Sequence, residues 1–309
     1  MGSKINNPFR FGRKIGWVAP YLVLAPALII FGIFQFLPSM ATVAFSFTDI
    51  TRTGYREVSF VGLANYIEFF RPGQFYEKFV ALRNSLTFAI FVVVLQNAIA
   101  LGFAVILDKA WKGRGVFRGI LLLPVILGIT VNALIWKLMF NPFGGPVGTL
   151  VATVTGEIPL FFADPNLAFP LIIFIQVWSY IGYSTVIFLA GLQAIPKQLY
   201  ESAMVDGAKG WTRFRAITLP MISQATTVNV LLAIIGALRT FDTIYVTTNG
   251  QYGTYTMAFY MFQLAFTSTS GSGGGRLGFA SAVATLLFLI IFVVALIAQH
   301  YLRKREVDL

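Results

Sequence analysis

The chain contains few side chains that could do covalent or metal chemistry. Among its 309 residues there is no cysteine and a single histidine, His300. This composition excludes thiolate catalysis, disulfides and cysteine-ligated metal centres, and it removes most histidine-based metal and triad chemistry. His300 precedes a basic cluster near the end of the chain, a position typical of a membrane interface. We therefore expect no catalytic residues and no metal site.

Polar side chains within long apolar runs are the remaining candidates for function. Inside a membrane such groups are energetically expensive, so they tend to face the protein interior or a water-filled path. The candidates are Gln96, Asn97, Asn132, Lys137, Gln176, Trp178, Tyr180, Tyr183, Ser184, Gln224, Asn229, Arg239 and Asp242. Lys137 lies near the end of its run, from which its ammonium group can reach the interface. Arg239 and Asp242 are three residues apart and could pair on one helix face, which we favour over contact with a solute.

The elements that carry these groups are predicted to be membrane-spanning helices. Hydrophobic residues make up 57% of the chain and charged residues only 11%, whereas an average soluble domain is about 25% charged. A spanning helix needs about 20 predominantly apolar residues. Such runs occupy residues 17–46, 83–107, 117–140, 167–192, 217–240 and 277–301. The sequence thus predicts an all-α, multi-pass membrane protein with six transmembrane helices.

The distribution of basic residues predicts the orientation of these helices. The net charge of +11 would suggest nucleic acid in a soluble protein, but the basic residues cluster between apolar runs, so no nucleic-acid partner is expected. Of the 23 Lys and Arg residues, 15 fall on the side that contains both termini and 7 on the other. Cytoplasmic loops carry such an excess, so both termini are predicted to be cytoplasmic.

These assignments divide the chain into three parts. Residues 1–16 form a cytoplasmic segment, residues 17–301 form a single six-helix membrane domain, and residues 302–309 form a cytoplasmic tail. The first apolar run is longer than the roughly 7 to 15 residues of a signal-peptide core, so we expect it to be a retained helix. We expect membrane lipid to surround this domain.

Two connections are predicted to contain short helices. The first, about residues 47–82, includes the amphipathic sequence FVGLANYIEFF, which suggests short interfacial helices. The third connection is rich in Gly and Pro and has no Lys or Arg. Turns and a short helix are expected there.

Nucleotide-binding motifs do not support an ATPase within this chain. Residues 273–278 formally match G-x-G-x-x-G, but no strand precedes them and a membrane helix follows, so the match is discarded. The phosphate-loop pattern G-x-x-x-x-G-K-[ST] is absent from the sequence. If transport uses ATP, another subunit hydrolyses it.

The most specific pattern lies in the cytoplasmic segment 191–220. Pro196 is suited to the start of a helix, and Gly207 allows a sharp turn between two short helices. On helical spacing, small and aromatic residues form a stripe of Leu199, Ala203, Met204, Ala208, Trp211 and Phe214. We expect this stripe to bind a partner groove; the alternative is packing on the chain's own helices or the lipid surface.

This segment resembles the EAA loop of bacterial ABC-importer permeases. The pattern is Glu-Ala-Ala, three residues, Gly, nine residues, Ile, one residue and Leu-Pro, matched here by Glu201, Ser202, Ala203, Gly207, Ile217, Leu219 and Pro220. Only Ser202 departs from it. The likeness covers nearly the whole chain and is closest to the binding-protein-dependent sugar type, the maltose and glycerol-phosphate permeases. It includes FVGLANY (60–66), FRGILLLP (117–124) and FDTIYVTTNG (241–250).

The resemblance implies a type I ABC-importer permease of the bacterial inner membrane. Its expected partners are a second homologous permease, a dimer of ATPase subunits that bind ATP and Mg, an extracytoplasmic solute-binding protein and a sugar. No cofactor is expected in this chain. The EAA loop, residues 193–220, would dock on the ATPase. The residues implied in coupling are Glu201, Ser202, Ala203, Asp206, Gly207 and Ala208.

The resemblance also implies a route for the sugar. In maltose-type relatives, an aromatic residue on the fourth span and polar or small positions on the fifth contact sugar. Amides and hydroxyls beside aromatic rings suit a pyranose. The predicted pathway residues are Gln176, Trp178, Tyr180, Tyr183, Gly236, Ala237, Thr240 and Asp242. Because the small residues offer no side-chain hydrogen bonds, lining a pathway without tight binding stays open, as does a packing role for the aromatics.

The resulting functional hypothesis is uptake of a sugar or oligosaccharide by alternating access, driven by ATPase closure on the EAA loop. The rival is a secondary transporter driven by an ion gradient. Such transporters usually need carboxylates within the membrane. No Asp or Glu lies at the centre of any predicted span.

Overall fold

The computed structural model describes residues 19–51, 58–72, 75–109, 111–267 and 275–304. Within these ranges the chain is helical, with one isolated antiparallel bridge between Thr48 and Phe60 and no β-strand. The elements in chain order are α1 (Ala19–Phe31), the π-helix η1 (Gly32–Phe36), α2 (Leu37–Phe45), α3 (Ala64–Phe70), α4 (Phe75–Asp108), α5 (Arg114–Leu127), α6 (Ile129–Met139), α7 (Pro146–Thr155), the 3₁₀ turn η2 (Phe161–Ala163), α8 (Ala168–Gln193), α9 (Lys197–Val205), α10 (Gly210–Arg213), the π-helix η3 (Phe214–Thr218), α11 (Leu219–Met221), α12 (Ser223–Arg239), α13 (Asp242–Thr247), α14 (Met257–Phe266) and α15 (Leu277–Arg303). The predicted all-α class is confirmed for the described chain.

Four helices are long and apolar enough to cross a membrane, and they cover Tyr21–Phe45, Glu77–Asp108, Ala168–Gln193 and Leu277–Arg303. Two further candidates are bent pairs. The chain bends by 101° between α5 and α6, and by 67° between the segment Gly210–Met221 and α12. If each pair is one span, the described chain has six candidate spans, and otherwise four. The predicted third and fifth spans are thus each divided by a bend.

The bend between α5 and α6 is centred on Gly128. This residue has φ 81° and ψ 153°, a conformation that glycine adopts without a steric penalty. The bend leaves the Pro124 carbonyl without a helical donor, and the Asn132 side chain donates to it at 2.7 Å. Asn132 also donates to Ser179 on α8 at 3.0 Å. This buried polar residue therefore stabilises the bend.

Helix α8 is the centre of the bundle. In its apolar 18-residue stretch, 61% of the residues are buried, against 28% in the corresponding stretch of α4 and 22% in that of α15. Gly182 permits the close crossing of α5, because a Cβ at this position would lie 1.8 Å from the Leu121 carbonyl oxygen. α4 packs along α8, and α12 packs on both. These helices can therefore enclose a cavity.

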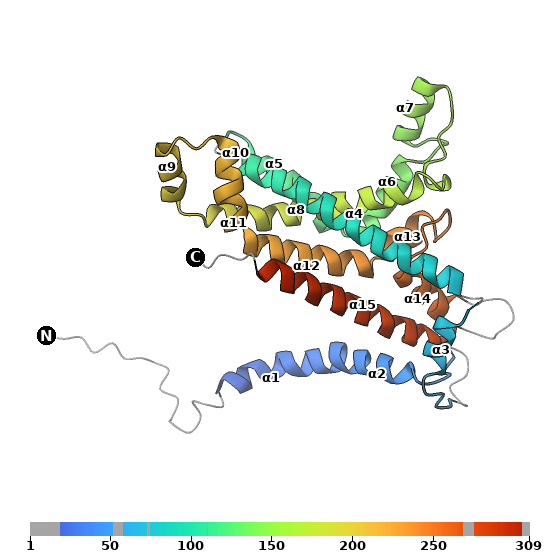
Figure 1. Ribbon diagram of the computed structural model, residues 1–309. Helices are drawn as coiled ribbons and strands as arrows, with labels where there is room; N and C mark the ends of the chain where they lie inside the picture. The colour runs from blue at the N-terminus through green and yellow to red at the C-terminus, as the bar shows by residue number, and fades with distance from the viewer. Residues whose placement is uncertain (1–18, 52–57, 73–74, 110, 268–274, 305–309) are drawn as a thin grey trace.

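The first candidate span is the opposite case. None of the residues in its apolar 18-residue stretch is buried, and Val23 and Phe34 are 79% and 74% exposed. Figure 1 shows α1 and α2 below α15, and α2 packs against that helix. A surface of this size and apolarity is suited to lipid or to another protein chain.

The connecting helices gather at two ends of the molecule. α9 and α10 lie at one end, which we call the α9 end, together with the last turns of α8 and α15 (Figure 1). α3, α13 and α14 lie at the opposite end, the α3 end. The short helices expected in the first and third connections are present as α3 and α7.

Candidate functional site

A cavity of about 340 Å³ lies midway along the long helices. Four elements supply its walls: α4, α5, α8 and α12. The lining residues are Gln96, Val125, Gln176, Tyr180, Tyr183, Ser184, Leu232, Ala233, Gly236 and Ala237. Because the walls come from segments far apart in sequence, a relative shift of these helices changes the cavity's shape.

The polar side chains in this cavity are only partly satisfied. Gln96 donates to the Ser184 hydroxyl at 2.8 Å, and both residues are buried. Gln176 is 3% exposed, and its Oε1 atom has no hydrogen-bond partner in the described part of the chain. Buried polar atoms are normally paired, so this oxygen is suited to accept a hydrogen bond from a ligand hydroxyl.

Aromatic and small residues form the rest of the cavity. Tyr183 is 46% exposed, whereas Tyr180 is half-buried. The flat ring of a tyrosine can cover an apolar ligand face while its hydroxyl forms hydrogen bonds. On α12, a Cβ added at Gly236 would meet no atom within 4 Å, so this wall leaves free space. The cavity can therefore admit a molecule with both apolar faces and hydroxyl groups.

Five of the eight predicted pathway residues line this cavity: Gln176, Tyr180, Tyr183, Gly236 and Ala237. The other three lie elsewhere. Trp178 packs edge-to-face on Trp136, with ring centroids 5.4 Å apart. Thr240 donates to the Gly236 carbonyl at 2.8 Å, and Asp242 accepts from Thr130 at 3.5 Å. These three side chains are engaged with the protein itself.

The favoured pairing of Arg239 with Asp242 is wrong. Within the described chain these residues form no ion pair, because α12 ends at Arg239 and Thr240 adopts an extended conformation. The three-residue spacing therefore does not place both side chains on one helix face. Lys137 donates to the Val246 carbonyl in the last turn of α13 at 2.7 Å, a contact that its sequence position did not indicate.

Several lining residues were absent from the predicted pathway. Gln96 and Ser184 had a sequence signal, because both are polar residues within apolar runs. Val125 and Leu232 had none, since most residues of their type in a membrane helix face lipid or other helices. Their place in the cavity depends on the crossing of α5 over α8 and on the packing of α12.

The segment that resembles the EAA loop forms two short helices with a tight turn. Pro196 directly precedes α9, as expected, and Gly207 has φ +76°. The Ala208 amide donates to the Ala203 carbonyl at 2.8 Å, and the Gly207 amide donates to the Met204 carbonyl at 3.1 Å. These two bonds form a Schellman motif, which needs a left-handed residue at the glycine position. The predicted turn at Gly207 is confirmed.

The surface of this loop is largely free of contacts with its own chain. α9 has no buried residue, and Glu201, Ser202, Asp206 and Gly207 are exposed, whereas Ala203 and Ala208 are half-buried. In the predicted stripe, Trp211 is 71% exposed and Met204 52%. Large apolar side chains at this exposure indicate a surface for another molecule.

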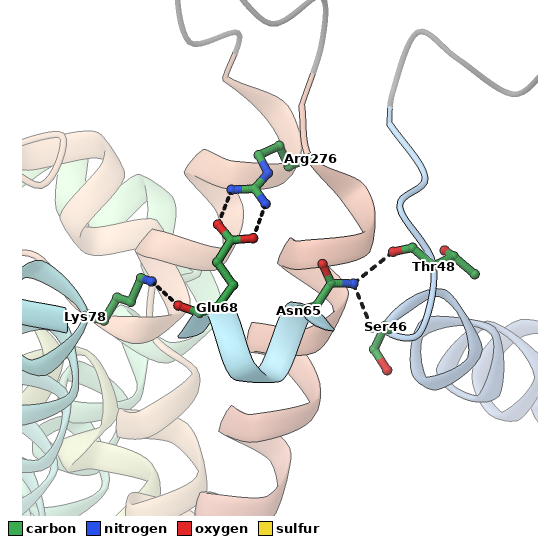
Figure 2. A network of polar contacts seen from close by, with 6 residues as sticks. All are labelled: Ser46, Thr48, Asn65, Glu68, Lys78 and Arg276. Carbon is green, nitrogen blue, oxygen red and sulfur yellow. Dashed lines mark hydrogen bonds and ion pairs between the residues drawn. The ribbon is translucent and has the colours of Figure 1, made fainter. Parts of the chain in front are cut away.

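A cluster of polar contacts at the α3 end was not predicted from the sequence. Figure 2 shows that Glu68 of α3 faces Arg276, whose guanidinium donates to both carboxylate oxygens at 2.7 and 2.6 Å. Lys78 donates to the Glu68 backbone carbonyl at 2.7 Å. Asn65 donates to the carbonyls of Ser46 and Thr48 at 2.9 and 2.8 Å. We call these six residues the α3 clamp, since they join α2, α3, α4 and the start of α15.

Burial and aromatic rings strengthen the α3 clamp. Lys78 is 4% exposed, and its ammonium group lies 5.4 Å from the ring centroid of Phe279. The Arg276 guanidinium lies 4.5 Å from the same ring. The hydrogen bonds from Arg276 hold the pKa of Glu68 below its ordinary value. This two-bond pair between Glu68 and Arg276 helps to fix how α3 sits on α15.

Glycine residues beside Arg276 serve close packing. A Cβ at Gly275 would lie 2.1 Å from the Ala265 carbonyl oxygen, and one at Gly278 would lie 2.0 Å from that of Thr48. Part of the discarded G-x-G-x-x-G match falls on residues 273–274, which lie outside the described ranges. The described residues also contain no group of three or more His, Cys, Asp or Glu side chains able to hold a metal ion.

Solved structures with the same fold belong to transporters of alginate. One, a bacterial alginate ABC transporter in complex with alginate pentasaccharide-bound periplasmic protein, matches with a TM-score of 0.78 and 24% identity, over 96% of this chain and 98% of that chain. Another, a bacterial ABC transporter involved in the import of the acidic polysaccharide alginate, matches with a TM-score of 0.77 and 25% identity, over 94% and 96%. The chain therefore has an ABC-importer permease fold.

Sequence relatives agree with this fold. The trehalose/maltose transport system permease protein MalF of Thermococcus litoralis is 35% identical over 274 residues, which are 88% of this chain and 89% of that protein. The arabinooligosaccharides transport system permease protein AraP of Halalkalibacterium halodurans is 32% identical over 291 residues, 92% and 87% of the two chains. Residues 98–307 match the family of binding-protein-dependent transport system inner membrane components. The chain belongs to this family and is the multi-pass permease subunit, distinct from the ATPase, of a binding-protein-dependent ABC importer.

Proposed function

We propose that this permease carries a sugar or oligosaccharide, released by an extracytoplasmic binding protein, across the bacterial inner membrane. The observation that carries the proposal is the central cavity, in which the unpaired Gln176 amide oxygen lies on the same helix as Tyr180 and Tyr183. A sugar hydroxyl can donate a hydrogen bond to the amide oxygen, and the tyrosine rings can pack on the apolar faces of the sugar. The printed names of the relatives, which transport trehalose, maltose or arabinooligosaccharides, support this substrate class.

The proposed topology has six spans with both termini in the cytoplasm. Each bent pair, α5 with α6 and α10–α11 with α12, then counts as one span. Figure 1 supports this arrangement, since α1 begins and α15 ends toward the α9 end. The excess of Lys and Arg on the side of the termini supports a cytoplasmic α9 end. In this proposal residues 17–301 are one membrane domain, between cytoplasmic segments 1–16 and 302–309.

The proposed assembly contains two permeases and two ATPase subunits. The ATPase subunits hold ATP and Mg, and the binding protein meets the α3 end. The EAA loop, residues 193–220, docks on an ATPase through its exposed surface. Glu201, Asp206 and the left-handed Gly207 shape this contact. Ser202, Ala203 and Ala208 allow close approach because their side chains are small.

The position of the loop in the chain suggests how its movement reaches the cavity. α8 leads directly into α9, and α12 follows α11, so the loop connects two walls of the cavity. At its base the two walls touch, because a Cβ at Gly191 on α8 would lie 2.8 Å from the Cβ of Ala225 on α12. A rigid-body shift of the loop therefore moves α8 and α12 relative to α4 and α5. Such a shift can open the cavity to one side of the membrane at a time.

Transport driven by an ion gradient receives no support from these observations. The residues that line the cavity include no Asp or Glu. Proton- and sodium-coupled carriers usually place such carboxylates at the membrane midplane.

Reconstitution tests the proposed function. The complex is purified in mild detergent with its co-purifying chains, placed in liposomes and supplied with ATP, the binding protein and a panel of maltose, trehalose and arabino-oligosaccharides. We expect ATP-dependent uptake of one of these sugars. Uptake by the chain alone under an ion gradient would contradict the proposal.

A substitution at Tyr183 tests the cavity. Tyr183→Ala should lower uptake about ten-fold, since an aromatic contact contributes about 0.5–1.5 kcal/mol beyond its buried area. Tyr21→Ala is the matched control, because Tyr21 on α1 is 66% exposed and does not line the cavity. Equal uptake by the two variants would show that Tyr183 is not a pathway residue.

A further inference from the structure

A second, smaller cavity lies at the α9 end between α4, α5 and α8. Its volume is about 170 Å³, and its walls are mostly polar. Its lining residues are Leu107, Arg114, Gly115, Arg118, Leu189 and Gln193. A cavity of this size holds several water molecules or one phosphate group. It shares no lining residue with the central cavity, so the two cavities are separate.

Two arginines in this cavity lack a counter-charge. Arg114 and Arg118 are one helical turn apart on α5 and are both exposed. Neither side chain has an ion pair or a hydrogen bond within the described chain. Like charges four residues apart on a helix repel each other. An anion bound between the guanidinium groups would remove this repulsion.

Backbone and amide donors complete the cavity. α5 begins after Gly113, and the amides of Gly115 and Val116 have no acceptor in the described chain. Gly115 itself lines the cavity, where its lack of a Cβ leaves its N–H accessible. Gln193 adds a side-chain amide from the last residue of α8. The cavity thus combines two positive charges with neutral donors and contains no acidic residue.

The surroundings indicate a membrane lipid as the source of the anion. Trp111, 41% exposed, packs on Phe117 with ring centroids 6.1 Å apart, and tryptophan is typical of the membrane interface. On the same helix Val116 and Ile120 are 70% and 55% exposed, a surface suited to acyl chains. In the proposed orientation this end faces the cytoplasmic leaflet, which carries anionic lipids.

We propose that this cavity binds the phosphate group of an anionic phospholipid such as phosphatidylglycerol. Arg114 and Arg118 donate to the phosphate oxygens, and the Gly115 amide and the Gln193 side chain donate to the remaining acceptors. Because Gln193 lies three residues before Pro196, the bound lipid anchors α8 at the point where the EAA loop begins. The proposal rests on the proposed orientation and adds a lipid partner to it.

Lipid titration of the purified importer complex tests this site without ATP or sugar, so its result does not depend on transport. The complex is held in a neutral detergent, and short-chain phosphatidylglycerol or phosphatidylcholine is added while native mass spectrometry counts the bound lipids. We expect one tightly retained phosphatidylglycerol per chain. The double variant Arg114→Gln/Arg118→Gln should bind it about thirty-fold more weakly, since each basic residue contributes about a five-fold factor.

A matched control removes the same charge at the same end. Arg303→Gln/Lys304→Gln changes two exposed basic residues at the end of α15, outside the cavity, and should leave retention unchanged. A second variant, Gly115→Val, keeps both charges but narrows the cavity; a Cβ there meets no atom within 4 Å, so we expect a folded protein with weaker binding. Gel filtration and thermal stability in neutral detergent verify folding.

Three results would overturn the proposal. The first is equal retention of phosphatidylglycerol and phosphatidylcholine. The second is unchanged phosphatidylglycerol binding in both cavity variants. The third is stabilisation by millimolar inorganic phosphate with none from phosphatidylglycerol, which would assign the cavity to a free anion.

Discussion

The two ends of the molecule differ in whether their charged side chains have partners within the chain. At the α3 end, Glu68 pairs with Arg276, and the buried Lys78 donates to the Glu68 backbone carbonyl on α3. At the α9 end, the exposed carboxylates of Glu201 and Asp206 form no ion pair within the described chain. Charges satisfied within the chain stabilise its fold, whereas unpaired charges beside exposed apolar groups are available to a partner.

Glycines show the same contrast. At the α3 end Gly275 and Gly278 allow backbones to approach each other, and any side chain would clash with a carbonyl oxygen. At the α9 end a Cβ at Gly207 would meet nothing within 4 Å, and glycine is needed there only for its positive φ. The first pair serves packing, and the second position serves the shape of an exposed surface.

The largest expected effect is at the closer of the two glycine contacts of the α3 end. Gly278→Ala should lower the free energy of unfolding by about 3 kcal/mol, because its Cβ would lie 2.0 Å from the Thr48 carbonyl oxygen. Thermal unfolding of the purified protein measures the change. Gly102→Ala on α4, where a Cβ has nothing within 4 Å, is the control and should not destabilise the protein. Equal stability of the two variants would remove the argument that α3-end glycines serve packing.

Substituting one glutamate at each end compares the two ends directly. Glu68→Gln should cost about 1 kcal/mol of stability, because Arg276 loses its counter-charge and both side chains are partly exposed. Glu201→Gln should leave stability unchanged and weaken association with the ATPase, since its side chain is exposed. Thermal unfolding and co-purification of the ATPase measure these two properties. Reversed effects would contradict the assigned roles.

A smaller effect is expected at the turn of the EAA loop. Gly207→Ala should weaken ATPase association about five-fold, because a left-handed conformation costs an L residue about 1 kcal/mol or more. Gly210→Ala is the control: its Cβ also has free space, but its φ is not positive. Titration of the ATPase onto the detergent-solubilised complex measures the affinity. Similar affinity of both variants would show that the turn geometry does not set the docking surface.

The smallest expected effect is a pH dependence restricted to the α3 end. The pKa of Glu68 is held below its ordinary value of 4.5, with its hydrogen bonds from Arg276 as the main cause. Its stabilising contribution is therefore present above about pH 4.5 and is lost as the pH falls through the lower folded-state pKa. Because the carboxylate is partly exposed, we expect a loss below about 1 kcal/mol.

Unfolding of the wild type and of Glu68→Gln between pH 7 and pH 3 isolates this contribution. The stability difference between them should shrink in acid, because the variant has no carboxylate at this position. A constant difference would show that the ion pair does not contribute to the pH dependence.

Periodicity and composition predicted much of the fold because each apolar run must satisfy its backbone hydrogen bonds within a helix. The short helices α3 and α7 and the turn at Gly207 followed from local residue types in the same way. The bend at Gly128 had weaker signals, because a glycine near a proline also occurs in a continuous membrane helix. Asn132 stabilises the bend by donating to the Pro124 carbonyl, eight residues back in the chain.

The cavity could be predicted only in part. Helical spacing puts Gln176, Tyr180 and Tyr183 close to one face of α8, and all three line the cavity. Trp178 is on the same helix but turns toward Trp136 on α6. Thr240 and Asp242 lie beyond the end of α12 at Arg239, whereas the predicted fifth span ended at residue 240.

The sequence by itself determined the membrane class, the order of the helices and the exposed EAA loop, because these depend on local hydrophobicity, charge and turn residues. Only the tertiary structure decided which polar side chains meet. It paired Glu68 with Arg276, 208 positions away in the chain, left Arg114 and Arg118 unpaired, and joined Val125 and Leu232 to the central cavity. The physical reason is that helix crossing angles and close glycine contacts, which set these distances, depend on packing between segments far apart in sequence.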